Sequence, residues 1–315
     1  MCRLDAGEPH QDLDRAVTAL AAGRLVILPT ETVYGLAGDA ANPRAVAAIF
    51  EAKGRPRFNP LIAHVCDIDR AHDLAHLGDL ALALGRAFWP GPLTLVAPFR
   101  AGAPVCDLAR AGLDTVALRV PAHPTALALL RRFESPLVAP SANRSGRPSP
   151  TTLADALSET GEAVGAALDG GPCAIGLEST VIGLADGRAR LLRPGAITRD
   201  QIETVIGPLA GAGAQAHRSP GRLARHYAPE APVRLDAMDV GPGEVFLAFG
   251  APPGPGTIFN LSPDQNLAEA AANLFAMLRA ADATTPTAIA VAPIPEGGLG
   301  EAINDRLRRA AGYVG

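Results

Sequence analysis

Residues 53–60 read KGRPRFNP, and the interpretation of the whole chain starts from this stretch. Lys53 is the only lysine among the 28 basic residues of the 315-residue chain. Lysine is a compact point charge and arginine a planar fork, so a site that fits only lysine does not accept arginine. Phosphate binding is one such site, which makes Lys53 a candidate ligand of a phosphate or another anion.

Lys53 ends a predicted helix that begins at the Asn-Pro pair 42–43. Four residues fall at the i, i+3, i+4 and i+7 spacing of one apolar helix face: Val46, Ile49, Phe50 and Lys53. The alternative is a solvated cation near the helix C-terminus, where the helix dipole favours it. The inward-facing position of Lys53, its uniqueness and the nearby Arg55 favour an anion site.

The predicted elements on either side make the chain an α/β protein. A helix over 12–22 leads into a buried strand at Leu25–Leu28, and residues 29–40, PTETVYGLAGDA, are interpreted as a polar loop. A glycine- and proline-rich stretch after the helix that starts at Thr198 is interpreted as a linker. We therefore expect two domains, at residues 1–207 and 231–315, joined by a linker or lid at 208–230.

Composition and missing motifs exclude several function classes. The net charge of −4 argues against a protein that binds nucleic acid mainly by neutralising phosphates. The chain has no GxxxxGK[ST], GxGxxG, GxSxG or HExxH motif. Its four cysteines form no CxxC pair, and no apolar run is typical of a signal peptide or membrane span. These features predict a cytoplasmic protein.

For the other candidate residues, the sequence alone supports two interpretations, one structural and one functional. His64 faces either the core or a cleft, and Arg119, which shares a strand face with Thr115, either forms a surface pair or grips a carboxylate. The loop PSANRSGRPSP at 140–150 contains common turn formers, yet its hydroxyl and amide groups also suit a site. Tyr227 either fills a packing gap or folds over a planar ligand.

Taken together, the chain resembles the threonylcarbamoyl-AMP synthase family, the YrdC-like enzymes, in the long form with an appended C-terminal domain. The resemblance covers most of residues 24–229, and the remainder resembles the accessory domain only in position and length. It rests on these blocks: PTETVYGL at 29–36, KGRPRFNPLIAHV at 53–65, WPGPLTLV at 89–96, LDTVALRVPAHP at 113–124, APSANRSGRPSP at 139–150, GLEST at 176–180, LLRPGAIT at 191–198 and SPGRLARHYAP at 219–229.

The resemblance implies a fold and a reaction. The fold would be a twisted mixed sheet flanked by helices with a concave site, followed by a smaller Rossmann-like α/β domain. The reaction would join L-threonine, bicarbonate and ATP into threonylcarbamoyl-AMP and pyrophosphate, as a nucleotidyltransferase with magnesium bridging the phosphates. The product would feed a tRNA threonylcarbamoyl transferase complex, with no membrane partner and no need for stable tRNA binding.

The resemblance also implies roles for individual residues. The catalytic signature falls on Lys53, Arg55, Ser141 and Asn143. The positions implied for threonine are Thr30, His64, Arg119 and Ser179. The positions implied for ATP are Arg55, Asn59, Thr115, Ser141, Ser149, Arg193 and Tyr227, and Ser179 is expected against ATP as well. No protein metal ligand is expected.

Two other functions stay open at the level of the sequence. One is a non-catalytic RNA-binding module, which the negative charge disfavours, and the other is a sensor that binds nucleotide without turnover. The chain also departs from the family pattern after SPG, where Arg222, Leu223 and Ala224 stand in place of the usual methionine, lysine and tyrosine. This departure predicts a different packing of the lid.

Overall fold

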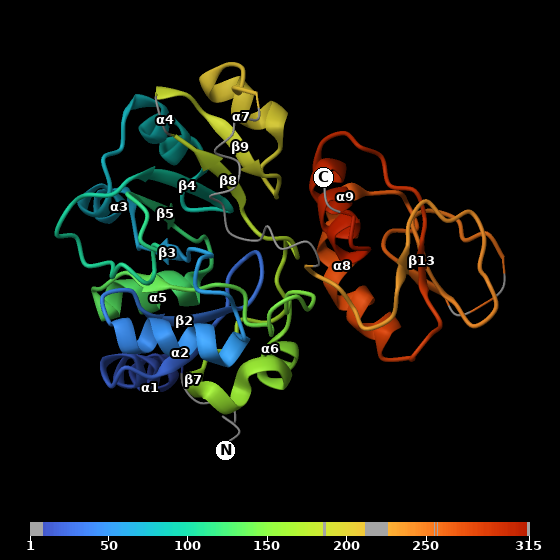
Figure 1. Ribbon diagram of the computed structural model, residues 1–315, viewed down its shortest axis with the longest axis horizontal. Helices are drawn as coiled ribbons and strands as arrows, with labels where there is room; N and C mark the ends of the chain where they lie inside the picture. Colours follow the sequence, from blue (N-terminus) through green and yellow to red (C-terminus); the bar gives the residue numbers. More distant parts are fainter. Residues whose placement is uncertain (1–8, 185–186, 212–225, 255, 257, 314–315) are drawn as a thin grey trace.

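The computed structural model describes residues 9–184, 187–211, 226–254, 256 and 258–313. Within these ranges the strands form one sheet of nine strands and a second sheet of four, with helices packed against both (Figure 1). The mixed α/β architecture expected from the sequence is confirmed. In the part of the chain that the structure describes, no helix is both long and apolar enough to cross a membrane.

The large sheet is mixed and builds the N-terminal two thirds of the protein. Its strands are β1 (Leu25–Leu28), β2 (Gly35–Asp39), β3 (Ile62–His64), β4 (Leu93–Pro98), β5 (Thr115–Arg119), β6 (Leu137–Val138), β7 (Val164–Ala167), β8 (Thr180–Gly183) and β9 (Arg190–Arg193). Their order is β7-β1-β2-β6-β3-β5-β4-β8-β9. β3 pairs parallel with β5, and this register sets His64 opposite Arg119.

The helices of this part are α1 (Pro9–Ala21), α2 (Pro43–Lys53), α3 (Ile68–Leu74), α4 (Asp79–Phe88), α5 (Pro124–Phe133), α6 (Leu153–Thr160) and α7 (Arg199–Ile206), with a 3-10 turn, η1, at Gly161–Ala163. α1 packs against α5, and α4 packs against α7 at the opposite end of the sheet (Figure 1). The helix face predicted to carry Lys53 is buried, as expected.

One sequence expectation was wrong: residues 35–39 of the expected polar loop form a buried strand, β2, between β1 and β6. The segment GLAGD lacks the large β-branched residues that usually mark a strand. Its small residues have a packing reason, because a Cβ at Gly38 would lie 3.1 Å from Leu25 Cδ2 and 3.2 Å from Ile49 Cδ1. Small side chains therefore let α2 lie close against the sheet.

The C-terminal part is a small parallel sheet with two long helices. Its strands are β10 (Val233–Arg234), β11 (Val245–Ala248), β12 (Ile258–Asn260) and β13 (Ile289–Val291), in the order β10-β13-β11-β12, and its helices are α8 (Leu267–Asp282) and α9 (Leu299–Ala310). All described pairings of this sheet are parallel. α8 and α9 lie on the side that faces the large-sheet part, and β13 lies beyond them (Figure 1).

A shared hydrophobic cluster joins the two parts. Val33 and Leu177, from loops of the large-sheet part, are buried in one cluster with Leu274 and Phe275 of α8. Gly176 has a φ of +73°, and a Cβ there would lie 2.6 Å from backbone atoms of α8. The loop before Glu178 is therefore pressed directly against α8. Most of the expected linker, including residues 222–224, lies outside the described residues.

Candidate active site

Lys53 ends α2 at a defined point. The Asn42 side chain accepts hydrogen bonds from the first turn of α2, and Gly54 ends the helix in the left-handed region with a φ of 58°. This geometry suits glycine, which has no Cβ to clash there. Lys53 itself is only 3% exposed. The helix thus holds a buried ammonium at a fixed place.

The loop at 140–150 surrounds that ammonium. Lys53 Nζ donates to the carbonyl oxygen of Ser141 at 2.5 Å and to that of Asn143, while the backbone N–H of Ser145 donates to the Lys53 carbonyl at 2.7 Å. Lys53 therefore meets Ser141 and Asn143, about ninety residues downstream, in one place. Burial, and next the charge of Arg55, hold the pKa of Lys53 well below its ordinary value.

Arg55 and Arg193 form a cationic cluster with Lys53, and the segment at 226–227 lies beside it. Burial, and next the charge of Arg193, lower the pKa of Arg55 to about 10, despite the opposing influence of Tyr227. His226 is buried, and burial followed by the charges of Arg55, Lys53, Arg309 and Arg193 lowers its pKa well below the ordinary range. Like charges gathered at one buried place favour the binding of an anion there.

Arg193 is fixed by the GLEST loop at 176–180. Its Nε and Nη2 donate to the Ser179 carbonyl at 3.1 and 2.8 Å, and Nη2 also contacts Ser179 Oγ at 3.1 Å. Gly195 allows this approach, because a Cβ there would lie 2.4 Å from the backbone nitrogen of Thr180. Ser179 Oγ shares a hydrogen bond of 2.7 Å with Thr94 Oγ1. The loop after β9 is thus locked onto GLEST.

Buried amide and hydroxyl groups lie on the loops that border the cluster. Asn143 donates through Nδ2 to the carbonyls of Arg144 and Arg147, and its Oδ1 is buried without a hydrogen-bond partner among the described residues. Asn59 Oδ1 is likewise buried and unpartnered within that part of the chain. Ser149, fully buried, donates to Glu178 Oε1. A buried polar atom without a partner is open to a hydrogen bond from a ligand or a water molecule.

A second group of residues surrounds Arg119 at the end of β5. Arg119 Nη2 donates to Glu31 Oε1 at 2.6 Å, and the backbone N–H of Ala122 donates to Glu31 Oε2 at 3.0 Å. Arg119 Nε is buried and unpartnered among the described residues. Glu31 therefore holds one side of the guanidinium and leaves another N–H to bind a carboxylate.

His64 and Thr30 belong to the same region. His64 Nδ1 lies 3.1 Å from the Ile62 carbonyl, and burial followed by the charge of Arg119 lowers the pKa of His64 to about 3, so the ring is neutral. Thr30 Oγ1 donates to the Val33 carbonyl at 2.6 Å and lies 2.8 Å from Thr32 Oγ1. The Thr30 hydroxyl thus also shapes its own loop.

Thr115 stands apart from these groups. It begins β5 opposite Pro98, four residues before Arg119. With a rise of ~3.3 Å per residue, the two side chains start ~13 Å apart. The role predicted for Thr115 against ATP stays a prediction.

Three charged residues of the site were missed by the sequence reasoning. Glu31 lies in PTETVYGL at 29–36 and Glu178 in GLEST at 176–180. The stretches that carry the family resemblance therefore already contained both residues. Arg306 is fully buried on α9 and contacts Glu178, although its helix carries no motif.

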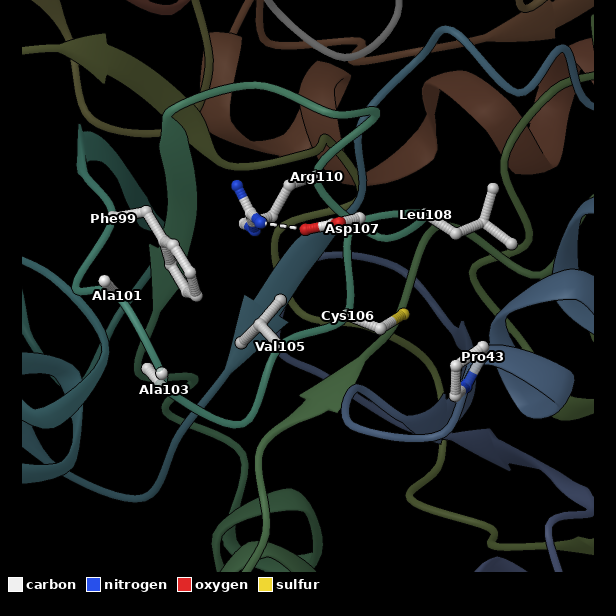
Figure 2. A pocket seen from close by; sticks show the side chains of 10 residues that line it. Pro43, Phe99, Ala101, Ala103, Val105, Cys106, Asp107, Leu108 and Arg110 are labelled. Carbon is white, nitrogen blue, oxygen red and sulfur yellow. Dashed lines mark hydrogen bonds and ion pairs between the residues drawn. The ribbon is translucent and has the colours of Figure 1, made fainter.

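A hollow of about 700 Å³ lies between the loop after β4 and the start of α2 (Figure 2). Arg110 lies with its guanidinium carbon 3.9 Å from the Phe99 ring centroid and pairs with Asp107. None of the residues predicted to act on substrate lines this hollow. This hollow therefore does not mark the candidate active site.

Comparisons with known proteins cover nearly the whole chain. Residues 18–195 match the family of the Sua5, YciO and YrdC proteins, described as "Telomere recombination", and residues 197–312 match "Threonylcarbamoyl-AMP synthase, C-terminal domain". A threonylcarbamoyl-AMP synthase of Bacillus subtilis is 40% identical over 98% of this chain and 95% of its own length. One of Pyrococcus abyssi is 41% identical over 92% and 91%.

A solved structure agrees with these matches. The crystal structure of P. abyssi Sua5 complexed with L-threonine has a TM-score of 0.89 and 38% sequence identity, covering 98% of this chain and 96% of that one.

Proposed function

The chain belongs to the threonylcarbamoyl-AMP synthase family, and from this premise we propose that it makes threonylcarbamoyl-AMP and pyrophosphate from L-threonine, bicarbonate and ATP. The observation that carries the proposal is the position of Lys53 between the carbonyls of Ser141 and Asn143, beside the positive charges of Arg55 and Arg193. The arrangement supplies positive charge where a triphosphate would bind. The Arg119 group, with its unpartnered Nε, supplies a carboxylate site.

The chemistry has two steps. The threonine amine attacks the carbon of bicarbonate, water leaves, and a carbamate forms. A carbamate oxygen then attacks the α-phosphorus of ATP, the bond to the β-phosphate bridging oxygen breaks, and pyrophosphate leaves. Such nucleotidyl transfer needs positioning and charge neutralisation more than a covalent enzyme intermediate. The enzyme class we propose is therefore a nucleotidyltransferase.

The proposed roles follow the contacts. Lys53, Arg55 and Arg193 neutralise the phosphates. The buried side chains of Asn59, Asn143 and Ser149, with the partly buried hydroxyl of Ser141, position the nucleotide. Tyr227 is proposed to cover the nucleotide, since its ring packs against Phe275 of the C-terminal cluster while its phenol lies close enough to Arg55 and Arg193 to affect the pKa of each.

For threonine, the proposed ligands lie in the second group. Arg119 would bind the carboxylate, with Thr30, His64 and Ser179 around the rest of the molecule. Because His64 is neutral, it can accept a hydrogen bond from the hydroxyl or the amine without adding charge.

The side-chain oxygens of the candidate site decide whether it could hold a magnesium ion. Among the described residues no three His, Cys, Asp or Glu side chains form a cluster that could hold a metal ion. Asn59 Oδ1 and Asn143 Oδ1, both buried and unpartnered in that part of the chain, are hard oxygen donors that suit Mg²⁺ together with phosphate oxygens. The ion would supply further neutralisation of phosphate charge.

We also propose a downstream partner, a location and a domain division. The product would pass to a tRNA threonylcarbamoyl transferase complex, and stable binding of tRNA is not required. The described cysteines Cys66, Cys106 and Cys173 are free thiols, which supports a cytoplasmic location. Residues 1–207, 208–230 and 231–315 would be the catalytic domain, the linker and the accessory domain.

The test is mass spectrometry of a reaction that contains ATP, threonine, bicarbonate and magnesium. We expect the mass of threonylcarbamoyl-AMP, and its loss when threonine or bicarbonate is omitted. ATP binding with no product under the complete conditions would instead support a nucleotide sensor. Salt-dependent tRNA binding without turnover would support an RNA-binding module.

A further inference from the structure

Arg306 links the C-terminal part to the candidate ATP site. It lies on α9, is fully buried, and donates through Nε to Glu178 Oε2 at 3.0 Å. Its Nη1 donates to the Pro194 carbonyl at 2.7 Å and to Asp305 Oδ2 at 2.8 Å. Its guanidinium carbon lies 5.4 Å from the Tyr227 ring centroid. One arginine of the C-terminal part therefore contacts two loops of the large-sheet part and the ring proposed to cover ATP.

Glu178 is the group through which this contact reaches the site. One carboxylate oxygen binds Arg306 and the other accepts from Ser149, a residue with a proposed ATP contact. Burial would raise the pKa of Glu178, but Arg306, Arg193 and the Ser149 hydroxyl together lower it, so the group is a carboxylate. Its charge also acts on Lys53.

A buried carboxylate beside phosphate-binding cations competes with the phosphates for those cations. A buried ion pair that loses one partner leaves the other charge uncompensated, at a large cost. With Arg306 absent, Glu178 would turn its full charge toward Arg193 and Lys53. Both are cations that the phosphates need.

We propose that Arg306 is a positioning residue of the ATP site: it neutralises Glu178, keeps that carboxylate from pairing with Arg193 and Lys53, and fixes it against Ser149. The proposal rests on the assignment of ATP to the cation cluster. It gives the C-terminal part a direct task in nucleotide binding. Through Arg306, α9 supplies the positive charge that balances the carboxylate of Glu178.

The experiment compares Arg306→Met, Glu178→Gln and the double variant in the full chain, with Arg199→Met as the matched control. Arg199 forms the exposed 2.8 Å ion pair with Glu301, which also joins the two parts but does not touch Glu178. ATP binding is measured by calorimetry with magnesium present, KM values are measured for ATP and for threonine, and thermal unfolding reports whether each variant is folded.

We expect Arg306→Met to raise the Kd and KM for ATP about 10- to 100-fold, the range for loss of a charge-assisted hydrogen bond. The KM for threonine should change less than that for ATP, because Arg306 and Glu178 form no described hydrogen bond with Arg119, which is proposed to bind the threonine carboxylate. The double variant should bind ATP more tightly than Arg306→Met, because it removes the uncompensated carboxylate as well. Arg199→Met should match the wild type.

Two results would overturn the proposal. One is a double variant that binds ATP no better than Arg306→Met, since Arg306 would then not act through Glu178. The other is equal loss of threonine and ATP binding in a folded Arg306→Met chain. If Arg306→Met alone is unfolded, a folded double variant with the ATP affinity of Glu178→Gln supports the proposal. A wild-type chain that binds ATP without threonine-dependent pyrophosphate release would contradict the proposed reaction and leave this comparison intact.

Discussion

Replacing Lys53 with methionine separates what the ammonium does for the fold from what it does for the reaction. Methionine keeps an unbranched apolar side chain that is one heavy atom shorter than that of lysine. It removes the charge and the hydrogen bonds from Nζ to the carbonyls of Ser141 and Asn143. Any change in stability or in turnover is therefore due to the ammonium.

The effect on stability should be small for an electrostatic reason. Each lost charged hydrogen bond is worth ~1.5–3 kcal/mol. Against this, the pKa of Lys53 is lowered by burial and by Arg55, so at neutral pH its proton is bound more weakly in the folded protein than in the unfolded chain. Ionised Lys53 thus opposes folding below its unfolded pKa, and methionine ends that cost. We therefore expect a net loss smaller than the ~3–6 kcal/mol that the two hydrogen bonds alone would give.

Turnover should fall much further. In the proposed site the Lys53 ammonium faces the phosphate charge that builds up in the reaction. Loss of one such group typically costs ~3–4 kcal/mol, which is about 10²- to 10³-fold in kcat. The assay is threonine- and bicarbonate-dependent release of pyrophosphate, run beside thermal unfolding. The control is Arg44→Met, which removes a cation from the exposed start of the same helix. Near-normal turnover in Lys53→Met, or an equal loss in Arg44→Met, would refute the reasoning.

Four further outcomes are expected. ATP binding should take up protons at pH values between the depressed pKa of Lys53 in the free protein and its higher pKa in the complex, because phosphates favour the ammonium; calorimetry in buffers of different ionisation enthalpy measures this, and Lys53→Met should reduce it. Arg119→Lys should raise the KM for threonine ~10-fold or more and leave the KM for ATP unchanged, since lysine cannot hold Glu31 and a carboxylate side by side. A change in both KM values would argue against the assignment of Arg119 to the threonine carboxylate. Between pH 7 and 4, the free energy of unfolding should fall less for His64→Asn than for the wild type, as measured by urea titrations. The reason is that the unfolded chain protonates His64 near its ordinary pKa of 6.5, while the folded chain does so only near 3. Equal acid sensitivity would contradict a buried neutral ring. Gly176→Ala should destabilise the chain by at least ~1 kcal/mol, since it adds both a strained φ and a Cβ against the α8 backbone, and an unchanged Tm would show that the two parts can separate there.

The sequence was most informative where a local pattern had one structural solution. The helix that carries Lys53 could be predicted from its Asn-Pro start, apolar spacing and Gly54 stop, and the structure has all three. The strand at Gly35–Asp39 was missed because its small residues are selected by close packing of α2, a tertiary reason that no local pattern expresses.

Contacts between distant segments were beyond the sequence patterns. The meeting of Lys53 with Ser141 and Asn143 could be stated only as a requirement of the resemblance. Arg306 gave no signal, because the segment LGEAINDRLRRA reads as an ordinary charged amphipathic helix. Its burial depends on Glu178, which lies 128 residues away in the chain.

The loop at 175–179 has a consequence for how this protein can be divided. Leu177 is buried in the core of the C-terminal part, while its neighbours Glu178 and Ser179 bind Arg306 and Arg193. The backbone N–H of Ile175 donates to the Glu31 carbonyl at 2.9 Å. Five consecutive residues thus belong to both halves. In a chimera that takes its C-terminal half from a relative, residues 175–179 would face helices with which their side chains do not match. This loop, α8 and α9 must therefore be exchanged together, although the loop lies in the sequence of the large-sheet part.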